Sequence, residues 1–235
     1  MTTPGWLLDE LIHAGDEHLD QDYVPGYDEK SQTDPQVDLD ILLAAGLGRE
    51  HTLIDFGAGT GTFVIAAAAH CARVIAVDVS PQMLKVLDAK ITAAGISNIE
   101  RIHAGFLRHT HSGELADFVY SRHALHHLPD FWKAYALSRI AGMLKPGGTF
   151  YLRDLVYSFE PDETESMLEN WLAGAAPSSD RGWTRAELEQ HIREEHSTFN
   201  WLLESMLERA GFEIVERFER ESKIYAGYLC VKRAN

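Results

Sequence analysis

A loop with glycine at every second position is the feature that most constrains how this chain folds. Residues 52–56 have the composition of a buried strand, and they lead directly into glycines at positions 57, 59 and 61. Residues 63–69 are mostly small and apolar, which predicts a helix packed closely on a sheet. Glycines allow the main chain to turn sharply and leave no side chain to keep a ligand away from the backbone. The sequence therefore predicts a strand, a tight ligand-binding turn and a helix.

An acidic residue follows the next predicted strand. Residues 74–78 are apolar up to Asp78, whose carboxylate is expected at the carboxyl edge of the sheet, where open α/β folds bind ligands. An acid at that place accepts hydrogen bonds from two ribose hydroxyls. The glycine spacing narrows the choice of family, because the dinucleotide fingerprint requires Gly or Ala three positions after its second glycine. Thr62 occupies that position, and the third glycine falls one residue earlier, at Gly61.

This pattern resembles the first motif of class I S-adenosylmethionine-dependent methyltransferases. The resemblance implies an α/β fold, a three-layer α/β/α sandwich around a mostly parallel seven-stranded sheet with an antiparallel last strand. It also implies S-adenosyl-L-methionine as the cofactor, S-adenosyl-L-homocysteine as the product, and methyl transfer to an O, N or C atom of a small-molecule acceptor by in-line displacement. The cofactor contacts that it implies are Tyr27, Asp55, Gly57, Ala58, Gly59, Gly61, Asp78, Val79, Met83, Gly105, Phe106 and Ser121.

The resemblance also gives these contacts expected roles. Asp55 is expected to order the loop, the glycines to admit the methionyl part, and Asp78 to bind the ribose. Val79 and Met83 would contact the two faces of the adenine, and Ser121 would lie beside the sulfonium. The third predicted strand ends at Gly105, where the family commonly has a glycine followed by an acid that binds the adenine amino group. Phe106 follows here. Phe106 therefore either stacks on the ring or reads it through its backbone N–H.

Later motifs give the domain organisation. A His-His-Leu loop at 126–128 and the Leu-Lys-Pro-Gly-Gly run at 144–148, a helix stop and turn, are together typical of small-molecule methyltransferases of this class. A strand-turn-strand finish suits an antiparallel end of the sheet. The predicted divisions are an N-terminal arm or lid over 1–36 and a methyltransferase domain over 37–235, with a helical insert after the fifth strand at about 156–209 that walls the substrate pocket.

Three histidines lie on the loop after the fourth predicted strand, where the activated methyl group should project: His123, His126 and His127. A neutral imidazole accepts a proton near pH 7, so one of them is a candidate general base. The alternative is that such a histidine only packs beneath the cofactor or orders the loop. No carboxylate or thiol stands at a recognisable ligand spacing, so no metal site is predicted. Residues 194–196, Glu-Glu-His, read as an exposed helix end and not as a carboxylate pair for acid–base chemistry.

Aromatic residues outside the family motifs are the candidates for the acceptor pocket: Tyr23, Tyr157, Trp171 and Trp183. Tyr23 and Tyr27 belong to the predicted arm, where class I methyltransferases of this general type carry a cap over the cofactor. The other interpretation is that these two tyrosines are surface aromatics that pin the arm to the domain.

Composition limits the partners and the location. The 36 acidic residues against 21 basic ones leave a net charge of −15, which repels a phosphate backbone, so no nucleic-acid partner is expected. No apolar run approaches the roughly 20 residues of a membrane span, and residues 1–10 show no export signal. We therefore predict a cytoplasmic protein without a membrane partner, in which Cys71 and Cys230 are reduced core thiols. A monomer and a homodimer are both compatible with the sequence.

Three other functions fit parts of the sequence. A nicotinamide-dependent reductase shares the glycine loop, but Thr62 and the strand-turn-strand end oppose it. A non-catalytic module that binds S-adenosylmethionine or S-adenosylhomocysteine would carry the same motifs as a methyltransferase. So would an enzyme of the same fold that performs other chemistry on the cofactor.

Overall fold

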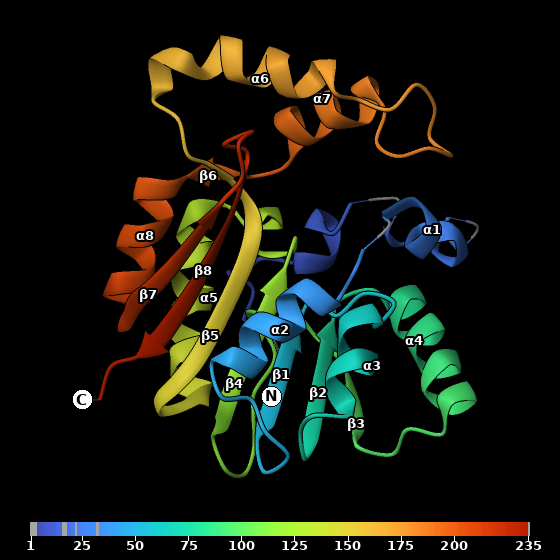
Figure 1. Cartoon of the computed structure of the whole chain (residues 1–235), viewed down its shortest axis with the longest axis vertical. Coiled ribbons are helices and arrows are strands. Elements are labelled where there is room, and N and C mark those ends of the chain that lie inside the picture. Colours follow the sequence, from blue (N-terminus) through green and yellow to red (C-terminus); the bar gives the residue numbers. More distant parts are fainter. Residues whose placement is uncertain (1–3, 16–17, 22, 32, 235) are drawn as a thin grey trace.

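A mixed sheet of eight strands runs through the middle of the protein (Figure 1). The structure, a computed structural model, describes residues 4–15, 18–21, 23–31 and 33–234. Strands β1 to β5 run parallel in the order β3-β2-β1-β4-β5, and β8 runs antiparallel between β5 and β7. The strand bounds are β1 Thr52–Phe56, β2 Arg73–Asp78, β3 Ile99–His103, β4 Ala116–Arg122, β5 Leu144–Tyr157, β6 Thr198–Phe199, β7 Phe212–Glu219 and β8 Tyr225–Lys232.

The predicted mostly parallel sheet with an antiparallel last strand is confirmed. The sequence did not predict β6, a two-residue strand that pairs with the end of β5. The strand predicted for β5 was also too short, because Lys145–Gly148 was expected to be a turn. In the structure this segment is an irregularity within β5, where the register against β4 shifts between Ala116 and Phe118.

Helices cover both faces of the sheet and make the three layers. On one face lie α2 (Gln36–Ala44), α3 (Thr62–Ala68) and α4 (Pro81–Ala94), and on the other lie α5 (Asp130–Met143) and α8 (Asn200–Arg209). At the start of α4, the Ser80 hydroxyl accepts a hydrogen bond from the Met83 N–H at 3.1 Å, and Pro81 is the first helical residue. Such a cap satisfies a backbone donor that the helix leaves free.

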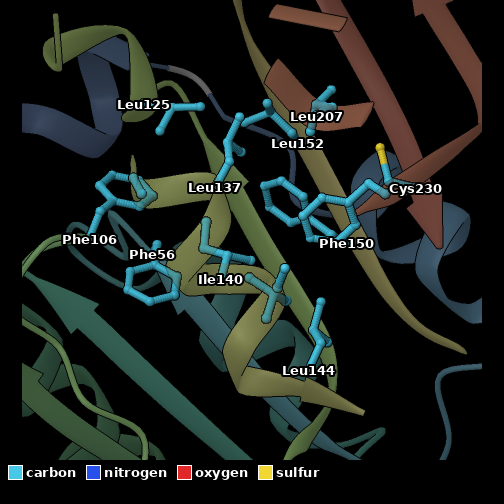
Figure 2. Close-up of a cluster of buried hydrophobic side chains, with 14 of the residues drawn as sticks. Phe56, Phe106, Leu125, Leu137, Ile140, Leu144, Phe150, Leu152, Leu207 and Cys230 are labelled. Atoms are coloured by element: carbon cyan, nitrogen blue, oxygen red, sulfur yellow. The ribbon is translucent and has the colours of Figure 1, made fainter. Parts of the chain in front are cut away.

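Strand β1 shows why both layers form. Successive side chains of a strand point to opposite faces, and Leu53 packs in the cluster beneath α2 and α3, whereas Ile54 and Phe56 pack in the cluster beneath α5 and α8. Figure 2 shows the second cluster, with Phe56, Ile140 and Phe150 side by side. Complete burial of such a side chain is worth about 1.5–3 kcal/mol, so each face of the strand holds its own helical layer.

The arm and the insert lie at the carboxyl end of the parallel strands. The arm contains two 3-10 helices, η1 (Glu10–His13) and η3 (Val24–Gly26), and the short α1 (Tyr27–Ser31). After β5 come η5 (Pro161–Glu163), α6 (Thr164–Ala173) and α7 (Arg185–Glu194); α6 and α7 cross the top of the molecule in Figure 1. Lys30 joins arm to insert, because its Nζ donates to Glu187 Oε1 at 2.5 Å. Within the described ranges, no helix is long and apolar enough to span a bilayer.

Candidate functional site

A cavity lies where β1 and β2 end, and the glycine loop forms one of its walls. We call it the loop cavity. It brings together most of the predicted cofactor contacts: Tyr27, Asp55, Gly57, Ala58, Gly59, Asp78, Val79, Met83, Gly105 and Phe106. These residues come from the arm and from the ends of β1, β2 and β3, so the parallel sheet gathers them at one edge, where α/β folds bind ligands.

The glycine loop combines close packing with one open position. All three glycines have positive φ angles, between 55° and 84°, a region that side-chain-bearing residues rarely adopt. An added Cβ at Gly57 would collide with the Ala124 side chain, and one at Gly61 would collide with Leu87. At Gly59, no atom lies within 4 Å of an added Cβ. Gly57 and Gly61 therefore serve packing, whereas the backbone at Gly59 faces free space.

The Asp78 carboxylate accepts hydrogen bonds from two backbone N–H groups, one of them in the glycine loop. Its Oδ2 accepts a hydrogen bond from the Gly59 N–H at 2.8 Å, and its Oδ1 accepts one from the Ser80 N–H at 2.7 Å. Burial raises the pKa of Asp78, and these two hydrogen bonds oppose the rise. The carboxylate is thereby held in one orientation at the cavity wall, with lone pairs left to accept from a ligand.

Asp55 is a buried acid with unused hydrogen-bonding capacity. Burial raises its pKa well above the ordinary value, and the nearby carboxylates of Asp78 and Asp38 raise it further. Its Oδ1 has no hydrogen bond to any residue that the structure describes. Asp55 lines the loop cavity beside Gly57, so an acid that is easier to protonate than usual lies in the wall where a ligand would bind.

Glu10 closes the end of the loop cavity near Gly105 and Phe106. Its two carboxylate oxygens accept from the Leu107 N–H at 3.2 and 3.1 Å. Burial raises its pKa to about 7, against the opposing effect of the Leu107 and Phe106 backbone contacts. The Phe106 ring itself stacks on Phe56 with the centroids 5.0 Å apart, as Figure 2 shows. The family commonly has an acid where this chain has Phe106. Glu10, a residue of the arm, therefore brings a carboxyl group to that end of the cavity.

A second cavity, of about 700 Å³, continues from the first toward the helical insert. We call it the histidine cavity. Tyr23, Trp171 and Trp183 line it, as the sequence predicts for an acceptor pocket, together with His123, His126 and His127. The two cavities share several lining residues: His18, Tyr27, Ser31, Thr33, Arg122, His123 and His127. Ligands in the two cavities would therefore meet at a boundary formed by these shared residues.

His126 lies between two carboxylates. Its Nδ1 is paired with Asp154, which also accepts from the His126 backbone N–H at 2.9 Å, and its Nε2 is 2.7 Å from Glu195 Oε2. Burial alone would lower the pKa of His126, but Asp154 and Glu195 outweigh it and raise the pKa to about 9. Burial alone would raise the pKa of Glu195, but hydrogen bonds from His126 and His191 outweigh it and hold that pKa far below the ordinary value. With both nitrogens engaged, His126 does not have the geometry of a general base.

His123 and His127 are the neutral histidines of the cluster. Burial lowers the pKa of His123 to about 3, and the neighbouring Arg122 lowers it further. Burial and the charge of His126 lower the pKa of His127 well below its ordinary value. Each ring has one buried nitrogen with no hydrogen bond to a described residue, Nε2 of His123 and Nδ1 of His127.

Three predicted contacts lie outside the lining of both cavities. The Ser121 hydroxyl donates to the Phe56 carbonyl at 2.9 Å and is fully buried. Gly61 packs against Leu87. Tyr157 packs with Phe159 and Phe199 in a separate apolar cluster. Contacts with distant residues pack these three positions away from the cavities. The residues next to them in the sequence do not predict those contacts.

Several lining residues were not singled out in the sequence, namely Glu10, His18, Arg122, His191 and Glu195. The expectation that residues 194–195 form an exposed helix end is wrong for Glu195. Its Oε2 lies 2.7 Å from both His126 and His191, and the side chain is 20% exposed. No motif marks these positions, because they reach the site from the arm, the insert and β4.

Comparisons with known proteins agree with this geometry. A family described as "Methyltransferase domain" matches residues 53–148, from β1 through the glycine loop and the histidines to the start of β5. The match covers less than half of the chain. The chain has the Rossmann-like fold of class I S-adenosylmethionine-dependent methyltransferases.

Relatives of this methyltransferase domain show how far the similarity extends. A ribosomal protein L11 methyltransferase of Thiobacillus denitrificans is 32% identical over 144 residues, which is 61% of this chain and 45% of that protein. This chain thus spans less than half the length of that relative. The solved structure of YcgJ from Bacillus subtilis superposes with a TM-score of 0.64 at 16% identity and covers 85% of this chain and 100% of YcgJ.

A structure that contains the cofactor product of the predicted reaction is also similar in fold. The N-methyltransferase NodS of Bradyrhizobium japonicum, solved in complex with S-adenosyl-L-homocysteine, superposes with a TM-score of 0.61 at 16% identity, covering 85% of this chain and 86% of NodS. At this identity the likeness concerns the fold of the methyltransferase domain and not its acceptor.

Proposed function

We propose that this protein transfers a methyl group from S-adenosyl-L-methionine to a small-molecule acceptor. The observation that carries the proposal is Asp78, held by Gly59 at the carboxyl edge of the parallel sheet in a cavity that continues into a second one. The family match over residues 53–148 supports the reaction class. One cavity would hold the cofactor and the other the acceptor, with shared walls between them.

The residues of the loop cavity fit the parts of S-adenosyl-L-methionine. The oriented Asp78 carboxylate suits a pair of ribose hydroxyls, and the open backbone at Gly59 leaves room for the methionyl part. Val79 and Met83 offer apolar contacts for an adenine ring. The carboxyl group of Glu10, beside the backbone of residues 106–107, offers the polar contact at the ring edge.

The histidines at the boundary would position the acceptor. When bound, the cofactor supplies an electrophilic methyl group on a sulfonium, and alignment of the acceptor provides much of the acceleration of such a displacement. His123 and His127 line both cavities, so their rings would contact an acceptor that lies at the boundary. A base is required only for an acceptor that arrives protonated. His126 orders the loop through Asp154 and Glu195.

The size and charge of the site support a small acceptor. A volume of about 700 Å³ lies within the range of about 300–1,000 Å³ that small-molecule pockets have. The net charge of −15 disfavours a nucleic acid. We place the enzyme in the cytoplasm, which is supported by two cysteines that are free and buried and would suit a reducing compartment.

Isothermal titration with S-adenosyl-L-homocysteine and S-adenosyl-L-methionine tests the proposal directly. We expect micromolar binding to the parent protein and at least tenfold weaker binding, about 1.4 kcal/mol, to Asp78→Ala. Asp88→Ala is the matched control, because this acid on α4 is exposed and pairs with Arg101; its affinity should equal that of the parent. If the folded parent binds neither ligand, the proposed function is wrong.

A further inference from the structure

Two histidines and a glutamate converge in the wall of the histidine cavity. His126, His127 and Glu195 each offer one ligand atom, and these three atoms lie within 4.8 Å of one another. Glu195 Oε2 is 2.7 Å from His126 Nε2 and 3.7 Å from His127 Nδ1. We propose that these three side chains bind one divalent transition-metal ion. The sequence hides this donor set, because Glu195 follows the histidines by nearly seventy positions.

Buried neighbours hold two of the three ligands in place. Asp154 pairs with His126 Nδ1, which leaves Nε2 directed at Glu195. His191 Nδ1 is 2.7 Å from Glu195 Oε2, while its Nε2 lies 2.9 Å from the Ser197 hydroxyl. A metal-binding histidine almost always donates its second ring N–H to a carboxylate, carbonyl or water, and a metal-binding carboxylate is itself hydrogen-bonded. Asp154 and His191 are placed to serve as these outer partners.

One unsatisfied atom lies in the cluster. His127 Nδ1 is buried and forms no hydrogen bond with a described residue, and Glu195 Oε2 is 3.7 Å away. Such an atom is uncommon in folded proteins, and a cation between the two side chains would satisfy it. Bonds of 2.0–2.2 Å to a tetrahedral ion separate the ligand atoms by about 3.3 Å. Glu195 Oε2, at 2.7 Å from His126 Nε2, would therefore move outward by about half an ångström.

The donor set selects the kind of ion. Two imidazole nitrogens and one carboxylate suit zinc or ferrous iron, whereas Mg²⁺ and Ca²⁺ prefer oxygen ligands. Three protein ligands leave coordination positions open, and all three side chains line the histidine cavity, so these positions would face the acceptor. This last step rests on the proposed methyl transfer. It implies that the acceptor offers an oxygen that can bind a metal.

Metal binding can be measured without any acceptor. The purified protein is stripped with a chelator and titrated with Zn²⁺ and with Co²⁺, which reports an ordered nitrogen–oxygen site through its visible absorption. We expect one equivalent of metal to bind the parent, and affinity to fall at least tenfold in Glu195→Gln and in His127→Gln. Glu194→Gln is the matched control, since this exposed neighbour accepts from Gln190 and lies outside the three-ligand cluster. Its metal affinity should be unchanged.

Two outcomes would overturn the proposal: a folded parent that binds neither ion at micromolar concentrations, or equal affinity of all four proteins. Circular dichroism checks the fold of each variant, and if Glu195→Gln does not fold, His127→Gln carries the test. S-adenosyl-L-homocysteine is titrated against the same samples. Metal binding without S-adenosyl-L-homocysteine binding would support the metal site and contradict the proposed function. S-adenosyl-L-homocysteine binding without metal binding would support the proposed function and contradict the metal site.

Discussion

The Glu10 carboxylate on the N-terminal arm accepts a hydrogen bond from the Leu107 backbone N–H, with 3.1 Å between Oε2 and N, although the two residues are 97 positions apart. The contact fastens the arm across the end of the loop cavity, and an added side chain at Gly105 would collide with it. A buried carboxyl group whose pKa is raised to about 7 therefore lies against the proposed adenine subsite.

The first prediction concerns pH. The folded pKa of Glu10, about 7, exceeds its ordinary value of 4.5, so the folded state holds the proton more tightly than the unfolded state. The free energy of unfolding should therefore fall as the pH rises from about 4.5 to about 7, by up to about 3 kcal/mol. Urea unfolding from pH 4.5 to 8 should show a smaller fall for Glu10→Gln, which stays neutral. Parallel profiles for the two proteins would refute the prediction.

Gly59→Ala should weaken S-adenosyl-L-homocysteine binding at least tenfold. The backbone there has a φ of 55° and faces open space in the loop cavity, so a new methyl group would occupy the place of the ligand. Gly113→Ala is the control, because Gly113 also has a positive φ, 91°, and open space around it but lies on an exposed loop. Both variants should lose about 1–2 kcal/mol of stability, the cost of a side chain in the left-handed region. Calorimetric titration should separate them; equal affinities would show that no ligand lies against Gly59.

Asp38→Asn should destabilise the fold strongly. Asp38 is fully buried in α2 and accepts from Tyr120, Tyr151, Arg122 and Arg153. Removing the charge leaves two partly buried guanidinium groups and two tyrosine hydroxyls without their shared charged acceptor, which costs about 3–5 kcal/mol. Asp40→Asn, on the exposed side of the same helix, should change the free energy of unfolding by less than about 0.5 kcal/mol. The two midpoints of urea unfolding give the comparison, and a loss below about 1 kcal/mol in Asp38→Asn would contradict the argument.

Lys30→Met should loosen the arm from the insert. The ammonium group pairs with Glu187 and lies 4.5 Å from the centroid of the Trp183 ring, so it joins two walls of the histidine cavity. Limited proteolysis should cleave the arm of Lys30→Met several times faster than that of the parent. Lys85→Met, an exposed lysine on α4, should be cleaved at the parent rate. An unchanged rate for Lys30→Met would mean that other contacts hold the arm.

The sequence alone determined the sheet and the glycine loop. The bounds of β1 agree with the residues predicted for it, and α4 starts where Ser80 and Pro81 favour a helix start. These features depend on local chemistry: strand periodicity, backbone freedom of glycine and capping of a helix end act over a few residues. Asp78 could be predicted for the same reason, since the end of a parallel strand fixes the edge at which its side chain arrives.

Only the tertiary structure decided which distant side chains complete the site. Glu10 and Glu195 lie in segments without a recognisable motif, yet one reaches Leu107 and the other reaches His126. The same folding removed Tyr157 and Ser121 from the cavities by packing them elsewhere. The protonation of the histidines was decided in the same way, because the pKa of each ring depends on burial and on carboxylates that approach it from other elements of the fold.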